Sequence, residues 1–334
     1  MRLQDLSRPL ARRCLGIPRF CRESLGVDLR GSRLLVAYST GLDSTALLHL
    51  LRLLRGPLNL TLFAAHAHHG LRPESDQELV HAMATCDELN IPCRTTRLDV
   101  PSLRASSGEG LEECARKARY AFLHSALRNV EADWIVTAHH GDDLAEDIVM
   151  RLLRGAGWPG LGGMPGVDHE RRLLRPLLDW RKSELRAILE EAGATWREDP
   201  SNSATDRTRN RVRHDILPLL RRENPSFAET ARQLWTLAHI DGEYWNDKLP
   251  SLSSPIKDYL LQATQLDAHQ AARLRVYKAV LDAMGPGQAL ASHLLLLDRT
   301  WVRKNCGRSI QFPGDKVARV EPDGIHFSFQ HRAP

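Results

Sequence analysis

The chain has few cysteines, and none of them lies close to another in the pattern that metal sites use. No two form a C-x-x-C pair among the six present: Cys14, Cys21, Cys86, Cys93, Cys114 and Cys306. A zinc knuckle or an iron–sulfur centre needs closely spaced thiols, so the sequence argues against both. Scattered single thiols are typical of a reducing compartment, which predicts a cytoplasmic protein.

Long hydrophobic runs are also missing. No run approaches the length of about 20 apolar residues that crosses a membrane, which predicts no membrane partner. The hydrophobic share of 42% and the charged share of 26% are those of an ordinary globular protein. The formal net charge of +5 is mild support for a polyanionic partner.

The first 22 residues are rich in Arg and Leu and poor in acids. Such a segment can be interpreted as an organelle transit peptide. The alternative is an amphipathic first helix. We favour the helix because its pattern leads directly into the first predicted strand.

Two familiar nucleotide-binding motifs are absent, namely the Walker loop G-x-x-x-x-G-K-[ST] and G-x-G-x-x-G. Instead, residues 39–44, "STGLDS", join an apolar run at 34–38 to a helical pattern at 44–54. A strand-to-helix turn exposes backbone N–H groups at the positive end of a helix dipole, and the hydroxyls add donors. This turn could hold pyrophosphate, or Ser39 or Asp43 could simply cap the helix.

Short apolar runs alternate with helical patterns from residue 33 to about residue 176. The predicted strands are 34–38, 60–66, 93–98 and 134–138, and the predicted helices are 44–54, 76–89, 110–128 and 143–154. This alternation predicts an α/β fold with a doubly wound parallel sheet that binds ligands at the carboxyl ends of its strands. The glycine- and proline-rich residues 157–166 suit a mobile flap.

The second half of the chain has a different pattern. A short strand and a helix are expected at 173–193, followed by a basic connector at 197–220 that ends in a helix. Beyond Pro225 the pattern is helical to about Trp301, and the tail alternates with turns at 313–314 and 322–324, which predicts a small β hairpin or meander. The predicted domains are an N-terminal helix at 1–28, a catalytic domain at 29–220 and a helical and β domain at 221–334.

Four acids crowd the start of the helix predicted at 143–154: Asp142, Asp143, Glu146 and Asp147. The helix dipole favours one or two acids there. Like charges at this spacing repel, so the set predicts a cation among them. The cation could be an amine substrate or magnesium bound to a nucleotide.

Histidines and arginines follow several predicted strands. His66, His68 and His69 follow the second strand, and His139 and His140 follow the fourth. A zinc cluster lacks the thiols or H-x-x-x-H spacing that would support it. Arg116 and Arg119 lie three residues apart after the third strand. They could form a solvated helix face or stabilise a phosphate leaving group, and Arg119 is the better candidate.

Six ordered segments resemble one family. Residues 39–44 are similar to the S-G-G-x-D-S loop of the PP-loop ATP pyrophosphatases. Together with "HAHHGLRPESDQE" (66–78), "GLEECARKARYAFL" (110–123), "TAHHGDDLAEDIVMRLLRGAGWPGLGGM" (137–164), "LLRPLLDWRKSEL" (173–185) and "EDPSN…RNRVR" (198–213), they closely resemble the bacterial tRNA(Ile)-lysidine synthetases over about residues 30–220.

This resemblance implies a reaction. Such enzymes use ATP to adenylate the position-2 carbonyl oxygen of the wobble cytidine in tRNA(Ile) with a CAU anticodon. The ε-amine of free L-lysine then displaces AMP. The resemblance thus implies ATP with Mg²⁺, free lysine and tRNA(Ile) as ligands, and a homodimer is possible.

The resemblance also implies site residues. The residues that would bind ATP are Ser39, Thr40, Gly41, Leu42, Asp43, Ser44, His66 and Arg119. Asp43 would act through magnesium. The residues that would bind lysine are Asp143, Glu146 and Arg175. Those that would bind tRNA are Arg209, Asn210 and Arg213. For the arginines, a basic surface helix is an equal alternative. Catalysis would use Asp43, Arg119, His139, Asp143 and Glu146.

Two positions depart from the family pattern. Thr40 replaces the first glycine of the loop, and its Cβ makes a positive φ costly. Asp147 follows Glu146 where the family usually has Thr. Two rival functions are a PP-loop tRNA thiolase, which generally carries C-x-x-C pairs, and a catalytically inactive RNA-binding protein.

Overall fold

The computed structural model describes residues 2–68, 74–107, 110–197, 208–250, 252 and 255–330. Within it the chain forms two compact units. Unit 1 contains residues 1–146 and 164–232, and unit 2 contains residues 147–163 and 233–334. The predicted domains, a catalytic one at 29–220 and a helical and β one at 221–334, stay a prediction.

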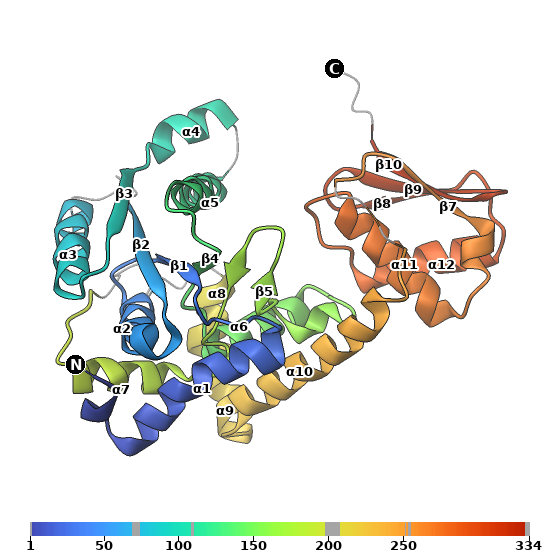
Figure 1. The fold of residues 1–334 in the computed structure, drawn as a ribbon. Helices are drawn as coiled ribbons and strands as arrows, with labels where there is room; N and C mark the ends of the chain where they lie inside the picture. The colour runs from blue at the N-terminus through green and yellow to red at the C-terminus, as the bar shows by residue number, and fades with distance from the viewer. Residues whose placement is uncertain are drawn as a thin grey trace. The chain divides into compact units, whose positions relative to one another are not determined.

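Unit 1 is built on a six-stranded sheet with the order β3-β2-β1-β4-β6-β5 (Figure 1). All neighbouring strands are parallel except β5 and β6. The strands are β1 Arg33–Ala37, β2 Thr61–His68, β3 Cys93–Arg97, β4 Trp134–Val136, β5 Val167–Asp168 and β6 Leu173–Leu174. The predicted doubly wound α/β fold is confirmed.

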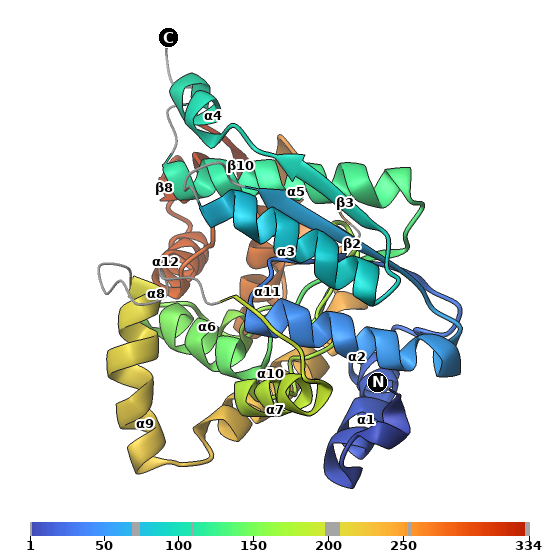
Figure 2. The ribbon, with the colours of Figure 1, turned by 90° about the vertical axis from the view of Figure 1, so that its left-hand side faces the viewer.

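Helices cover both faces of this sheet. Figures 1 and 2 show α5 (Leu111–Asn129) on one face and α2 (Leu42–Leu58) with α7 (Lys182–Ala192) on the other. Leu35 in the central strand is fully buried and packs in one cluster with Leu123 and Leu127 of α5. Strands buried on both faces read as continuous apolar runs, which is why residues 34–36 show no alternation.

The other helices of unit 1 are α1 Arg8–Leu25, α3 Glu74–Glu88, α4 Val100–Ser107, α6 Gly141–Leu153, α8 Thr208–Arg211 and α9 Leu217–Glu223, with a π-helical segment at Val212–Ile216. Helix α6 continues into unit 2. In α1 the buried residues include Cys14, Ile17 and Cys21, which recur at helical spacing. The expected amphipathic first helix is confirmed.

Unit 2 combines helices with an antiparallel sheet. Its helices are α10 Phe227–Asn246, which begins in unit 1, α11 Gln270–Ala283 and α12 Ala291–Val302. Its sheet has the order β7-β10-β9-β8, with β7 Tyr259–Gln262, β8 Ser309–Phe312, β9 Lys316–Glu321 and β10 Gly324–Phe329. The predicted meander at the tail is confirmed.

The prediction of an all-helical stretch up to Trp301 is wrong at one place. Residues 259–262 form β7, which pairs with β10 in the register Ile325 to Leu261. Leu261 is fully buried in the core of unit 2, and Tyr259 packs against that core, whereas Leu260 is exposed. A strand this short is decided by a distant pairing partner, and local periodicity cannot reveal it.

The glycine-rich residues 157–166 include a short 3₁₀ helix, Gly160–Gly162. A side chain at Gly162 would place its Cβ 2.2 Å from the Cβ of Ala238, so the backbone of this turn approaches α10 closely within unit 2. The expected flap movement stays a prediction.

Candidate active site

The site lies where the sheet reverses its strand order. The chain runs from β1 outward to β3 and then returns to place β4 on the other side of β1. The loops after β1 and β4 therefore leave neighbouring strand ends, where open α/β sheets bind ligands. Residues 39–44 occupy the first loop, and residues 137–140 occupy the second.

Hydroxyl groups hold the first loop in a tight turn. The Ser39 backbone N–H donates to Ser44 Oγ at 3.1 Å, and the two serine hydroxyls are also 3.1 Å apart. Helix α2 starts after Gly41, and no side chain caps it. The alternative that Ser39 or Asp43 is the N-cap is therefore wrong. Helix starts without a side-chain cap leave backbone N–H groups available for an anion.

Thr40 has a left-handed backbone conformation with φ of +64°. This is the conformation that a glycine favours, so the loop keeps a glycine-like shape in spite of its threonine. The side chain is buried, its hydroxyl donates to the Ser39 carbonyl at 2.6 Å, and its own carbonyl accepts from the Arg197 backbone N–H at 2.9 Å. A β-branched residue in this region is strained.

We expect Thr40→Gly to preserve ATP use and to raise the free energy of unfolding by up to about 1 kcal/mol. A left-handed L-residue costs roughly 1–2 kcal/mol, and the added chain entropy of glycine offsets about 0.5–1 kcal/mol. Denaturant unfolding measures the change. Thr40→Ala is the matched control, because it removes the hydroxyl but retains the Cβ. A less stable glycine variant would show that the threonine contacts outweigh the strain.

His140 connects the two loops. It is buried, with its Nε2 atom 3.5 Å from Asp43 Oδ1 and 3.4 Å from Asp143 Oδ2. Its Nδ1 atom accepts a hydrogen bond from the Asp142 backbone N–H at 3.2 Å. Burial alone would lower the pKa of His140, but the carboxylates of Asp143, Asp43 and Asp142 outweigh it and raise the pKa above its ordinary value.

Asp143 and Glu146 project from the first turns of α6 and are almost completely buried, with exposed fractions of 7% and 2%. Arg209 donates to Glu146 Oε2 at 3.0 Å and to Asp143 Oδ1 at 2.9 Å. Arg213 donates to Glu146 as well, at 3.0 Å to Oε2, and approaches Asp143 Oδ1 at 3.3 Å. Both acids thus share a pair of guanidinium groups.

The remaining acids of α6 also have arginine partners. Asp142 pairs with Arg221 of α9, and Asp147 pairs with Arg151 at 2.7 Å within unit 2. In the described structure, the cations among these acids are therefore arginines of the chain itself. The predicted amine or magnesium ion stays a prediction. Lysine binding by Asp143 and Glu146 stays a prediction.

His139 lies beside this cluster and bonds to Thr137 Oγ1 through Nδ1 at 2.9 Å. Burial, which outweighs the neighbouring Asp143 carboxylate, lowers the pKa of His139 to about 4. The ring is neutral at pH 7 and is a weak base. His140, which has no role predicted from the sequence, lies close to both Asp43 and Asp143. The catalytic role of His139 stays a prediction.

The lowered pKa of His139 predicts a dependence of stability on pH. The unfolded chain binds a proton near pH 6.5 and the folded chain only near pH 4, so stability falls as pH falls between these values. The free energy of unfolding falls by at most about 3 kcal/mol over this pH range. Urea unfolding at pH 7 and pH 4.5 should show a smaller loss for His139→Gln than for the wild type. An equal loss in both proteins would contradict the assigned pKa.

Three more residues are predicted to contact ATP, namely Leu42, His66 and Arg119. His66 is buried in β2, its Nδ1 atom is 3.0 Å from the Tyr38 carbonyl, and its buried Nε2 atom has no hydrogen-bond partner. Leu42 is buried, so only its backbone can meet a ligand. Arg119 is exposed and lies over the ring of Tyr120 in α5. The structure does not bring Arg119 into contact with residues 39–44.

The predicted lysine and tRNA residues separate into two groups. Arg175 donates to the Pro165 carbonyl at 2.7 Å, and its positive charge contributes to the lowered pKa of His139. Arg209 and Arg213 belong to the acid cluster, whereas Asn210 is buried. Their contacts with tRNA stay a prediction. His69 and residues 198–202 lie outside the described residues.

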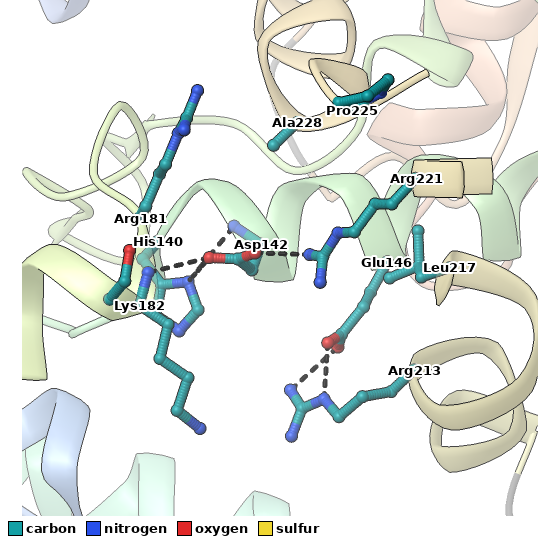
Figure 3. Close-up of a pocket in the computed structure, with 11 residues that line it drawn as sticks. His140, Asp142, Glu146, Arg181, Lys182, Arg213, Leu217, Arg221, Pro225 and Ala228 are labelled. Carbon is teal, nitrogen blue, oxygen red and sulfur yellow. Dashed lines mark hydrogen bonds and ion pairs between the residues drawn. The ribbon is translucent and has the colours of Figure 1, made fainter. Parts of the chain in front are cut away.

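A cavity of about 370 Å³ opens beside these groups, entirely within unit 1 (Figure 3). Its lining is His140, Asp142, Glu146, Arg181, Lys182, Ser183, Arg213, Leu217, Arg221, Pro225 and Ala228. Arg181 is the N-cap of α7, and Lys182 and Ser183 are its first residues. None of the three has a role predicted from the sequence. Their only sequence signal was a cluster of two cations before a helix.

The comparisons with known proteins agree with this geometry. The PP-loop domain family matches residues 19–220, more than half of the chain. In solved structures, the U34-tRNA thiolase NcsA of Methanococcus maripaludis has a TM-score of 0.54 at 18% identity, covering 66% of this chain and 76% of that one. That likeness concerns the fold alone. The fold and the loop after β1 define a PP-loop protein.

Proteins with similar sequences identify the family within the PP-loop class. A tRNA(Ile)-lysidine synthase of Nitratidesulfovibrio vulgaris is 44% identical over 330 residues, covering 92% of this chain and 95% of the relative. One of Geobacillus kaustophilus is 41% identical over 217 residues, covering 64% of this chain and 47% of the relative. The chain belongs to the tRNA(Ile)-lysidine synthase family.

Proposed function

We propose that this protein makes lysidine in tRNA(Ile). ATP transfers its adenylyl group to the position-2 oxygen of the wobble cytidine and releases pyrophosphate. The ε-amine of free lysine then forms a bond to carbon 2, and the activated oxygen leaves as AMP. The observation that carries the proposal is the 44% identity to a lysidine synthase over 92% of the chain. The test is ATP-dependent entry of labelled lysine into tRNA(Ile).

The loop at residues 39–44 is the proposed site for the phosphates of ATP. Its support is the first turn of α2, which has no side-chain cap, together with the paired hydroxyls of Ser39 and Ser44. Fixed backbone and hydroxyl donors can stabilise the charge that develops on departing pyrophosphate. Arg119 would have to reach the phosphates from α5, which makes it a weaker candidate than the loop itself.

The residues present fit a magnesium ion that arrives with ATP. Asp43 Oδ1 is buried and accepts no hydrogen bond from the described residues, and its ion-pair neighbour is His140 Nε2 at 3.5 Å. This oxygen therefore retains acceptor capacity for a metal ion. In the described part of the chain, no group of three or more His, Cys, Asp or Glu residues could hold a metal by itself. Magnesium commonly uses one or two carboxylates and the substrate phosphates, and it would neutralise phosphate charge there.

The acids Asp143 and Glu146 are the proposed site for the ammonium groups of lysine. Each carboxylate has about four acceptor positions, so lysine can share the acids with Arg209 and Arg213 or displace one guanidinium. The ε-ammonium, with a reference pKa of about 10.4, must lose its proton before it attacks. We assign the proton to the pair formed by His140 and Asp143, 3.4 Å apart.

The C-terminal unit is the proposed tRNA-binding region. After α12, residues Arg303, Lys304 and Arg308 are exposed, and no acid occurs between Arg299 and Phe312. Among the described residues, no carboxylate pairs with these three side chains. An exposed run of unpaired cations fits an RNA backbone, because each phosphate contact releases counterions.

We expect the triple variant Arg303→Gln, Lys304→Gln and Arg308→Gln to bind tRNA more weakly. The slope of log affinity against log salt should fall by about 2–3, since each lost phosphate contact removes 0.7–0.9 from it. Filter binding at several salt concentrations measures the slope. The control neutralises Arg19, Arg22 and Arg30, which already pair with Glu23 and Asp28. Equal slopes in the two triple variants would remove this surface from tRNA binding.

Two rival functions can be distinguished from lysidine synthesis. A thiolase of the same fold would deliver sulfur, and the absence of C-x-x-C pairs argues against it. A catalytically inactive RNA-binding protein would show no ATP-to-pyrophosphate turnover. No helix among the described residues is long and apolar enough to cross a membrane. A cytoplasmic location and a homodimer stay predictions.

A further inference from the structure

The cavity beside the acid cluster contains more positive than negative charge. Its lining includes the cations Arg181, Lys182, Arg213 and Arg221 and the acids Asp142 and Glu146. Both acids are already paired, Asp142 with Arg221 and Glu146 with Arg213. Among the described residues, the side chains of Arg181, the N-cap of α7, and Lys182, its first residue, therefore have no carboxylate partner.

The side chains of Arg181 and Lys182 point in different directions. Figure 3 shows the Arg181 side chain leading away from Glu146, whereas Lys182 extends past His140 on the side where the Arg213 guanidinium lies. Lys182 thus extends into the cavity that His140 and Glu146 also line, and its ammonium group has no carboxylate partner among the described residues.

The backbone of Lys182 is held in place by the same acid cluster. Its N–H donates to Asp142 Oδ2 at 2.8 Å, and Arg221 pairs with the other oxygen of that carboxylate. In addition, the Gly141 backbone N–H donates to the Trp180 carbonyl at 2.7 Å. The starts of α6 and α7 are therefore tied together, which fixes the base of Lys182 relative to Asp143 and Glu146.

The substrates need such a cation. Free lysine carries a carboxylate as well as two ammonium groups, and acids can bind only the ammonium groups. We propose that Lys182 binds an anionic group of a substrate in this cavity, a role that rests on the proposed function. The shared chemistry is an oxyanion, which is either the carboxylate of free lysine or a phosphate of ATP.

The test compares Lys182→Gln with Lys182→Arg, which retains the charge. Equilibrium binding of lysine and of ATP is measured separately from transfer of lysine to tRNA. We expect Lys182→Gln to weaken one ligand by roughly tenfold or more and Lys182→Arg to restore much of it. Arg12→Gln, which removes an exposed cation of α1 outside the cavity, is the control for a general loss of charge.

The same assay distinguishes the two sources of the oxyanion, the carboxylate of lysine and a phosphate of ATP. Weaker lysine binding with unchanged 1,5-diaminopentane binding, a ligand without a carboxylate, assigns Lys182 to the lysine carboxylate. Weaker ATP binding with unchanged lysine binding assigns it to a phosphate. Wild-type affinity for both ligands in Lys182→Gln would overturn the proposal. A wild-type protein that binds the ligands but transfers no lysine would contradict the proposed function alone.

Discussion

Asp43→Asn should reduce pyrophosphate release by at least about a hundredfold while the protein stays folded. The amide keeps the size of the side chain but removes the negative charge from a buried oxygen that accepts no hydrogen bond from the described residues. Loss of a charge-assisted contact made in the transition state costs about 3 kcal/mol or more, which corresponds to this factor. The charge also contacts His140 at 3.5 Å, so the variant loses the link between the two loops.

Stability should change little in this variant. A carboxylate in the first turn of a helix contributes only about 0.3–1 kcal/mol through the helix dipole. The measurement is pyrophosphate release with tRNA and ATP, together with thermal unfolding. Asp28→Asn, an exposed acid that pairs with Arg30, is the control. Release at the wild-type rate in Asp43→Asn would remove Asp43 from the mechanism.

The amide variants Asp143→Asn and Glu146→Gln should separate the two steps of the reaction. Each should still form the adenylated tRNA but transfer lysine ten- to more than a hundredfold more slowly, because each lost bond to an ammonium costs about 1.5–3 kcal/mol. The loop after β1 should be affected little by Glu146→Gln, because the contacts of Glu146 are with Arg209 and Arg213.

A paired assay tests this separation. Pyrophosphate release is measured without lysine, and lysine incorporation is then measured at rising lysine concentration. The control is Asp147→Asn on the same helix, whose acid pairs with Arg151. If Glu146→Gln lost both steps equally and high lysine gave no rescue, these carboxylates would serve the arginine cluster and not the substrate.

Much of the fold of unit 1 could be predicted because local signals agree with it. The fully buried residues of β1 and the glycine-containing turn before α2 are visible as an apolar run and a break. β7 could not be predicted, because four residues form a strand only through pairing with β10. Local periodicity carries no information about such a partner.

The candidate site was predictable in part for the same reason. Two strand ends that meet at one sheet edge brought Asp43 toward the acids of α6, as parallel topology requires. The arginine partners of Asp143 and Glu146 come from more than 60 positions away, and Arg213 lies in a π-helical segment. Which of two adjacent histidines faces the site also depends on packing, and here it is His140 that contacts both loops.

The most direct measurement is the incorporation of radiolabelled lysine into tRNA(Ile) with a CAU anticodon. The account predicts that label enters the tRNA only with ATP, that one pyrophosphate is released for each lysine incorporated, and that the labelled nucleoside is lysidine at the wobble position. Pyrophosphate release that accompanies no lysine incorporation, or transfer of sulfur in its place, would contradict the account.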